Sequence, residues 1–409
     1  MLAFSLTAPV SMVNQRAGRQ GPKIAITPSH ATVARLAWVF GDRDVAMYLR
    51  LDILREAVRH RHRVLALAPN LTTADQITLS ASGIESVALR PVAARYNPLG
   101  TLSARRRLAH SLHDWRATAV IIEDGDGLDL ATRAARQAGI GAIYPVLPAL
   151  EVGTAPHSAA TRSKTSWRPA LQRASSVFVP TPNDARLVMQ ALALTNVSHH
   201  LLPSVCLHLG IVGAEPLPAI DGGFIFLGLE TAFHGDPASP FALAVGAFDV
   251  RGTKARFRTI EIDLRAATHQ DGAAARPRPE LLPVHPEVGA MMTCLRTHVR
   301  SAHVVVIDGV GPLSTLLLAL ALALGRPVLA IDHPAYRDFV DVGVNGWLVP
   351  PDDQAALAQA MTAILKRPDL LPGMARAARQ KAERRLDQHA VIASLFEVLK
   401  LSDLRADAA

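Results

Sequence analysis

Short apolar runs alternate with amphipathic stretches along most of the chain, and this pattern leaves few folds open. The alternation begins near Arg35, and it is typical of βαβ units around a mainly parallel sheet. The first half therefore predicts one doubly wound α/β domain. Its predicted strands are Leu36–Phe40, Val64–Ala68, Ser86–Leu89, Ala119–Ile122, Ala142–Val146 and Val177–Val179, and its predicted helices are Met47–Arg59, Leu102–Trp115, Leu128–Ala138 and Asp184–Leu194.

The alternation stops near Leu201, where prolines and Asp221-Gly222-Gly223 mark a connector. A chain of 409 residues is also too long for one ordinary core. We therefore expect two domains with a linker between them. The expected parts are an N-terminal extension at 1–34, a first domain at 35–202, a linker at 203–221, a second domain at 222–388, and a C-terminal helix and tail at 389–409.

The second series of apolar runs predicts another α/β domain. Segment 271–283, rich in Ala, Arg and Pro, is expected to be a surface loop. The apolar stretch Leu313–Ile331 is expected to be a buried helix and strand, because Gly325-Arg326-Pro327 interrupts it. The predicted strands are Phe224–Leu227, Arg258–Ile262, Val304–Ile307, Val328–Ile331 and Trp347–Val349, and the closing helices are Gln354–Lys366, Leu371–Arg385 and Ala390–Lys400.

Composition excludes disorder for most of the chain. Hydrophobic residues make up 49% and charged residues 19%, the balance of a packed globular protein. Cys206 and Cys294 have no partners at zinc or redox spacing, so a reducing compartment fits best. His199, His200, Cys206 and His208 could be read as metal ligands, but they lie in a proline-containing connector, and we expect no metal.

Charge is uneven along the chain. Residues 1–200 hold 23 lysines and arginines against 13 aspartates and glutamates, whereas the whole chain is +8, so the second half is slightly acidic. A basic half suits an anionic membrane surface or a phosphate-linked lipid, or it is simply a soluble basic surface. The aromatic interleaving and motifs of nucleic-acid-binding modules are missing, so no nucleic acid is expected. Because Met1–Met12 lacks a basic leader, we expect a cytoplasmic protein, peripheral at the inner face of the membrane.

A set of motifs near the C-terminus carries a family resemblance. They are Gly325-Arg326-Pro327-Val328, Asp332-His333-Pro334, Asp338-Phe339-Val340, Gly343-Val344-Asn345-Gly346, Leu348-Val349-Pro350-Pro351 and Asp353. Together they resemble the C-terminal signature of family 4 glycosyltransferases. Asn97-Pro98-Leu99 and Ala134–Gly139 resemble a branch that acts in bacterial surface polysaccharide and exopolysaccharide biosynthesis.

This resemblance implies the GT-B fold, in which two Rossmann-like domains face each other across a cleft. The C-terminal domain would hold a nucleotide-sugar donor and the N-terminal domain a lipid-linked or glycan acceptor. Ligands gather at the carboxyl ends of the strands in such sheets. No cofactor is implied, because the donor is a substrate. The leaving diphosphate needs a stabilising cation, usually Arg or Lys, where no metal is bound.

The donor-side residues depart from the family pattern. The family has a G-R and then a K-G motif, where this chain has Gly228-Leu229 and His234-Gly235. Leu229 cannot bind phosphate, whereas a protonated His234 could; the alternative is an ordinary loop histidine. The family's two glutamates fall at Pro312 and Leu320. Losing a partner to a buried hydroxyl costs about 1–3 kcal/mol.

Three further residues remain as candidates for donor contact. Asp308, Gly309 and Gly311 follow a predicted strand and open a helix, so a backbone could approach a ligand there. A tight turn that needs only flexible residues is the alternative.

On the acceptor side, Asp124 and Asp126 follow a predicted buried strand in Glu123-Asp124-Gly125-Asp126-Gly127. Paired carboxylates could serve as a catalytic base or a cation site, and a solvated acidic turn explains them equally well. Arg105, Arg106 and Arg107 could meet lipid phosphates or simply coat a helix.

Two functions follow. One is hexosyl transfer from a nucleotide sugar to a lipid-linked or polysaccharide acceptor, retaining if the family's stereochemistry is kept. The other is a catalytically silent GT-B subunit that binds a protein partner in polysaccharide assembly. Leu229, Pro312 and Leu320 favour the second, and it predicts apolar packing around them. Fold alone does not decide between the two.

Overall fold

The computed structural model describes residues 33–89, 98–148, 167–191, 197–230, 240–247, 255–262, 280–284 and 288–401. Val33–Ala409 forms one compact unit, and the remaining unit, Met1–Thr32, lies outside the described residues. Within the described ranges, no helix is long and apolar enough to cross a membrane.

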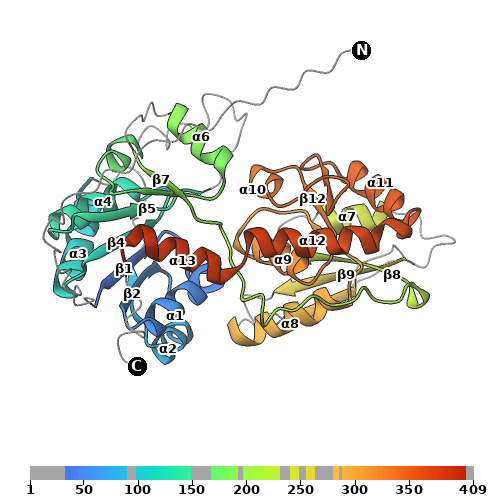
Figure 1. The fold of residues 1–409 in the computed structure, drawn as a ribbon, viewed down its shortest axis with the longest axis horizontal. Coiled ribbons are helices and arrows are strands. Elements are labelled where there is room, and N and C mark those ends of the chain that lie inside the picture. The colour runs from blue at the N-terminus through green and yellow to red at the C-terminus, as the bar shows by residue number, and fades with distance from the viewer. Residues whose placement is uncertain are drawn as a thin grey trace, which may run out of the picture. The chain divides into compact units, whose positions relative to one another are not determined.

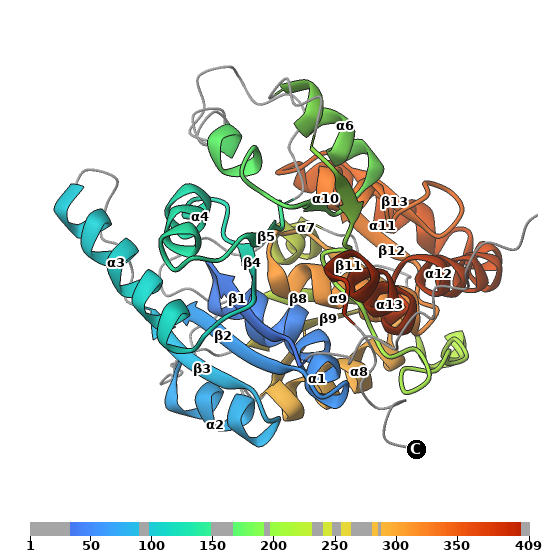
Figure 2. The same ribbon diagram turned by 60° about the vertical axis from the view of Figure 1, so that its left-hand side comes forward.

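The first sheet is parallel and has the strand order β3-β2-β1-β4-β5 (Figures 1 and 2). β1 (Arg35–Phe40) is buried along nearly its whole length, as expected for a parallel strand covered on both faces. Its other strands are β2 (Arg63–Pro69), β3 (Glu85–Leu89), β4 (Ala119–Glu123) and β5 (Ala142–Pro145), and its helices are η1 (Val45–Arg50), α1 (Leu51–Arg59), α2 (Thr73–Ala81), α3 (Pro98–Asp114) and α4 (Leu128–Gln137).

Two short strands extend this half. β6 (Val177–Val179) pairs with β7 (His199–Leu201), and Val146 bridges Phe178, so the pair continues from the end of β5. α6 (Pro182–Ala191) follows β6. The sequence prediction missed β7, because its alternating exposed and half-buried residues give no apolar run. The predicted helix Met47–Arg59 is a π-helical turn followed by α1.

The second sheet is also parallel, with the order β10-β9-β8-β11-β12-β13. β10 occupies the end of the segment predicted to be a loop at 271–283, which corrects that prediction. The strands are β8 (Phe224–Glu230), β9 (Ala255–Ile262), β10 (Glu280–Val284), β11 (Val304–Ile307), β12 (Val328–Ile331) and β13 (Gly346–Val349). The helices are α7 (Pro240–Ala247), α8 (Val288–Ser301), α9 (Pro312–Ala323), α10 (Pro334–Arg337), α11 (Gln354–Leu365), α12 (Leu371–Arg385) and α13 (Gln388–Leu399), with 3₁₀ turns η2 (Ile220–Gly222) and η3 (Pro368–Leu370).

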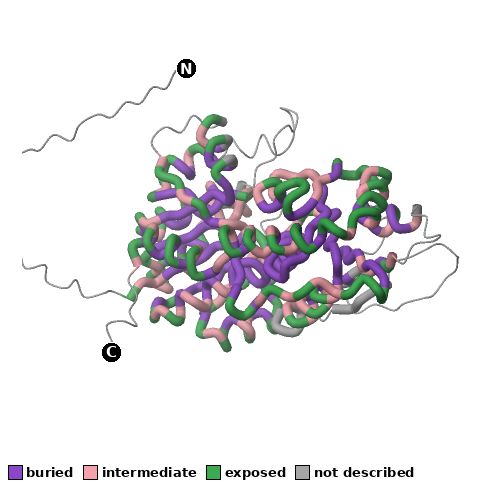
Figure 3. Tube along the Cα trace, turned by 45° about the vertical axis from the view of Figure 1, so that its right-hand side comes forward, coloured by how far each residue is buried: buried purple, intermediate pink, exposed green. Residues whose placement is uncertain are grey.

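Helix α9 is the centre of the larger core. Every residue from Leu313 to Ala323 is buried, and β12 follows after the turn at Gly325, so the apolar stretch is a buried helix and strand as predicted. Buried residues, purple in Figure 3, run through the interior, whereas the outer helices alternate buried and exposed positions. Gly325 has φ +71°, a left-handed conformation that favours glycine at the end of a helix.

Two segments connect the halves of the compact unit. The linker leads from β7 to β8, and α13 packs against α1. The two connections also bond to each other, because Leu207 N donates to Leu386 O and Gln388 N donates to Leu207 O. On α13, Phe396 meets the His60 ring edge to face, with 4.9 Å between ring centroids.

Candidate functional site

Each sheet has a topological switch point, where the chain order reverses between two adjacent strands. In the first sheet this is between β1 and β4, and in the second between β8 and β11. Ligands of doubly wound proteins bind beyond the carboxyl ends of the strands at such points. Most of the candidate residues from the sequence lie there.

At the first switch point, Asp124 is enclosed by its own turn. Its Oδ1 accepts a hydrogen bond from Gly127 N at 2.8 Å, and a Cβ on Gly41 or Gly127 would collide with its carboxyl group. Burial raises the pKa of Asp124 above its ordinary value, with Asp126 adding to the rise. Asp126 itself is exposed. The structure thus brings together one half-buried and one exposed carboxyl group after β4.

Glu123, the last residue of β4, forms a buried ion pair with Arg50 at the end of η1. Arg50 Nη2 lies 2.7 Å from Glu123 Oε1, and Arg50 Nε lies 2.9 Å from Oε2. Arg50 is 1% exposed, and its Nη1 donates to Pro203 O at 2.7 Å. Burial opposes the charge of Arg50, but the Glu123 carboxylate outweighs it and raises the pKa. The pair joins β4, η1 and the start of the linker.

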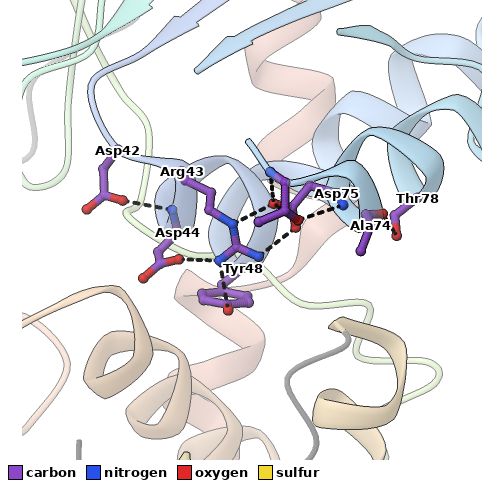
Figure 4. Close-up of polar contacts among 8 residues, drawn as sticks. Asp42, Arg43, Asp44, Tyr48, Ala74, Asp75 and Thr78 are labelled. Atoms are coloured by element: carbon purple, nitrogen blue, oxygen red, sulfur yellow. Dashed lines mark hydrogen bonds and ion pairs between the residues drawn. The ribbon is translucent and has the colours of Figure 1, made fainter. Parts of the chain in front are cut away.

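Sequence reasoning missed a polar network in the loop after β1 (Figure 4). Arg43 donates to both carboxylate oxygens of Asp75 at 2.6 Å, to Asp44 Oδ1 at 2.7 Å and to Tyr48 Oη at 3.2 Å. Asp42 Oδ1 accepts from Asp44 N at 2.8 Å. Gly41-Asp42-Arg43-Asp44 directly after a buried strand was the available signal, because charged residues in a βα loop stand at the ligand-binding edge.

The acidic members of this network differ in their pKa. Burial raises the pKa of Asp44, and the neighbouring Asp42 adds to this rise. Burial also works against ionisation of Asp75, but hydrogen bonds from Arg43 and Thr72 outweigh it and lower the pKa. Asp75 is also half of a capping box with Thr72 at the start of α2. Asp75 therefore holds Arg43 in place, and Asp44 is the more exposed carboxylate.

The second switch point is apolar by comparison. A Cβ on Gly228 would overlap the ring of Phe241, so the glycine makes room for an aromatic side chain of α7. Leu229 is buried, at 7% exposure, in the larger core. His234 and Gly235 lie outside the described residues. Within the described part of this edge, no cation stands at the position of the family's arginine.

Hydrogen bonds from α7 and from α10 hold the loop from Asp308 to Gly311. Asp308 Oδ2 accepts from Phe241 N at 2.8 Å, at the start of α7. Tyr336 Oη donates to Gly309 O at 2.6 Å from α10, and burial raises the pKa of Tyr336. Gly311 is the N-cap of α9 in an extended conformation. This loop is therefore pre-formed, and Asp308 already has a structural role.

Pro312 and Leu320 lie on α9, where the family has glutamates. Pro312 is the first residue of α9, and Leu320 is fully buried. α9 contacts η1 of the first half, and Leu320 belongs to the same core cluster as Met47 and Leu49. Apolar side chains thus pack where carboxylates would contact a donor, as the silent-subunit hypothesis predicts.

The basic triplet lies on α3. Arg106 and Arg107 are exposed, Arg107 Nη1 donates to Ser103 Oγ at 2.5 Å, and Arg105 is half-buried. Among the described residues, no group of three or more His, Cys, Asp or Glu side chains could hold a metal ion.

Comparison with known proteins supports the fold and the relationship of the second half. Residues 283–367 match the family model described as Glycosyl transferases group 1. The amylovoran biosynthesis glycosyltransferase AmsK of Erwinia amylovora is 36% identical over 85 residues, which cover 20% of each chain. The phosphatidyl-myo-inositol mannosyltransferase of Mycobacterium leprae is 40% identical over 100 residues, 24% of this chain and 26% of the relative. The matches thus span about a quarter or less of these relatives.

Solved structures match over nearly the whole chain. A glycosyltransferase from Rickettsia africae has a TM-score of 0.64 at 10% identity and covers 90% of this chain and 98% of its own. Anabaena HepE in complex with UDP has a TM-score of 0.62 at 14% identity and covers 90% and 100%. The chain therefore has the GT-B fold of glycosyltransferases. Its sequence relatives are glycosyltransferases that include proteins of amylovoran and colanic acid biosynthesis.

Proposed function

We propose that the chain is a GT-B glycosyltransferase that transfers a hexosyl group from a nucleotide sugar to a lipid-linked or glycan acceptor in surface polysaccharide biosynthesis. The observation that carries this proposal is the match of residues 283–367 to group 1 glycosyl transferases, because that range includes β11, α9, β12 and α10 at the second switch point. The names of the relatives support a polysaccharide role.

The transfer breaks the bond between the sugar C1 and the leaving diphosphate and forms a bond from C1 to an acceptor oxygen. The acceptor hydroxyl loses its proton, and the diphosphate leaves with the bonding electron pair. We assign donor contact to Gly228, His234, Gly235, Asp308, Gly309 and Gly311. The amides at the start of α9 face the same loop, and such amides favour phosphate. A protonated His234 would supply the cation that Leu229 does not.

On the acceptor side, we assign roles to Asp124 and Asp126 after β4. The exposed Asp126 is the accessible carboxylate of the two, while the enclosed Asp124 shapes the turn. Exposed Arg106 and Arg107, with Arg105, would face an anionic membrane surface, which suits a cytoplasmic protein at the inner face of the membrane.

A second candidate function is a catalytically silent subunit with a protein partner. The specific observation in its favour is the apolar packing at the donor edge: Phe241 covers Gly228, and Leu229 and Leu320 are buried in the core. Introducing a donor there would require these side chains to move.

Calorimetric titration with UDP-, GDP- and TDP-sugars and their free nucleotides tests the proposal. Micromolar binding that His234→Ala abolishes and His110→Ala leaves intact would support a donor site with a substitute cation; His110 is a suitable control because it is 78% exposed on α3. No binding to any nucleotide would overturn the transferase proposal and favour the silent subunit.

A further inference from the structure

One cavity lined by described residues lies away from both switch points. It has a volume of about 470 Å³, within the usual range of small-molecule sites. Its walls come from the linker just before β8 and from α12, and Gly325 precedes β12, so the cavity adjoins the amino ends of the strands. The lining residues are Ala214, Glu215, Pro216, Leu217, Gly325 and Pro372, together with four residues of α12 at 375, 376, 379 and 380.

A buried arginine lies beneath this groove without a carboxylate bonded to it. Arg326 is fully buried, and its Nη atoms donate only to backbone carbonyls, among them those of Glu215 and Pro216 at 2.8 Å. Among the residues that the structure describes, its Nε has no hydrogen-bond partner. Burial lowers the pKa of Arg326 to about 10, although nearby Glu215 partly offsets that effect. Five backbone carbonyl groups accept from the Nη atoms, but these carbonyls are neutral, so the charge of Arg326 gives the groove floor a positive potential.

The rim adds further positive charge. The Glu215 carboxylate lies 3.8 Å from Arg296 and 3.5 Å from Arg300, distances too long for strong hydrogen bonds. Arg376 is exposed on the α12 side, and within the described residues it forms no hydrogen bond or ion pair. One acidic side chain thus stands among several arginines, beside the apolar surfaces of Pro216, Leu217 and Pro372.

The linker and α12, the helix that precedes α13, face each other at this groove. Arg379, a lining residue on α12, donates to Val212 O and to Ala323 O at 2.7 Å. A few residues away, Leu207 and Gln388 hold the linker to the start of α13 through backbone hydrogen bonds. A molecule bound between residues 214–217 and α12 would therefore contact the linker and the helix that leads directly into α13.

We propose that this groove is an effector site for a small molecule that carries an anionic group on an apolar body, and that binding there stiffens the two connections. Arg376 and the field of Arg326 receive the anion, and the proline and leucine surfaces receive the apolar body. Neither the binding nor the stiffening depends on the proposed transferase function, because the groove lies at the opposite edge of the second sheet from the donor residues.

The test is calorimetric titration of the full chain with phenyl phosphate, inorganic phosphate and phenol. We expect phenyl phosphate to bind more tightly than either fragment, and Arg376→Gln to weaken it roughly tenfold, the effect of losing one charged hydrogen bond. Arg367→Gln is the matched control, since Arg367 is 60% exposed, lies outside the groove and pairs with Asp369. If Arg376→Gln and Arg367→Gln weaken phenyl phosphate binding equally, the proposed site is wrong.

Three further measurements separate this site from others. Ala375→Phe fills the groove without removing a charge, and it should abolish binding while the melting temperature shows that the variant remains folded. Displacement of phenyl phosphate by UDP would place the ligand in the donor site and overturn the proposal. Hydrogen exchange at the amides of Leu207 and Gln388 should slow when the ligand binds; binding without that change would overturn the regulatory role.

Discussion

Asp42, Arg43 and Asp44 follow β1 in the first sheet, whereas Gly228 and Leu229 lie near the end of β8 in the second sheet, and residues 231–239 after β8 lie outside the described residues. Both strands are central in sheets whose first five strands have the same order. The polar edge is held by ion pairs that cross between elements, such as Arg50 to Glu123 and Arg43 to Asp75. The apolar edge is held by packing of Phe241 and Leu320. The same strand order thus carries different side chains at the described parts of the two edges, and the chemistry has to be tested at each edge separately.

The largest expected effect lies at the polar edge. Glu123→Gln leaves the Arg50 guanidinium buried without its countercharge, and we expect a loss of about 3–5 kcal/mol of unfolding free energy. Urea unfolding measures this loss. Arg63→Gln is the control, because Arg63 and Glu85 form an exposed pair and the change should cost less than about 1 kcal/mol. If both variants lose equally little unfolding free energy, the Arg50–Glu123 ion pair does not stabilise this edge.

A smaller effect of different origin is expected at the apolar edge. Gly228→Ala forces a methyl group against the Phe241 ring and should cost about 1–3 kcal/mol. Gly246→Ala, on α7 with open space at its Cβ position, should instead stabilise by about 0.5–1 kcal/mol. Thermal unfolding of both variants measures the difference.

Phe241→Leu should relieve the cost of Gly228→Ala, because the smaller side chain leaves room for the methyl group. A double-mutant cycle measures that coupling. Additive losses in the cycle would mean that Phe241 is not the residue that requires glycine at position 228.

Two tyrosines give a matched comparison of the edges. Tyr336→Phe removes the hydrogen bond from the tyrosine hydroxyl to Gly309 O and should cost about 1 kcal/mol, measured by urea unfolding. Tyr48→Phe should cost less, because Arg43 keeps its bonds to Asp75 and Asp44. A larger loss in Tyr48→Phe would show that the Arg43 network depends on that hydroxyl.

The sequence was sufficient for the two parallel sheets, because strands buried on both faces, such as β1 and β11, leave continuous apolar runs. It was insufficient for β7, whose residues alternate between exposed and half-buried, and for η1, whose π-helical turn looks like the start of an ordinary helix. Strand β10 was missed because segment 271–283 has the composition of a loop.

Site residues were harder to predict, because a residue type does not reveal its partner. Asp308 was expected to contact a donor, and the structure shows its Oδ2 bonded to Phe241 N across 67 residues of sequence. The sequence analysis overlooked Arg43 because Asp75, the carboxylate that accepts its hydrogen bonds, lies on a different helix. Both cases depend on long-range contacts that periodicity and spacing do not encode.

The smallest expected effect concerns pH, and it should separate the polar edge of the first sheet from the amino end of β8 by the acidity at which each loosens. Burial lowers the pKa of His303, whose Nδ1 accepts from Ile225 N at the start of β8. Because the unfolded histidine has a pKa of about 6.5, the unfolded state takes up the proton first, and stability near β8 falls as pH drops below that value. The pKa of Asp75 is also lowered, but from an ordinary value of 3.8, so its contribution near β2 is lost only in stronger acid.

Hydrogen exchange corrected for intrinsic pH dependence checks this order at the amides of Ile225 and Thr72, which bond directly to His303 and Asp75. Between pH 7.5 and 5.5 we expect protection to fall at Ile225 and to hold at Thr72. His303→Gln should remove that pH dependence, while His110→Gln, at an exposed position, should leave it unchanged. Earlier loosening at Thr72 would mean that the ion pairs of the polar edge, and not the buried histidine of the apolar half, respond first to mild acid.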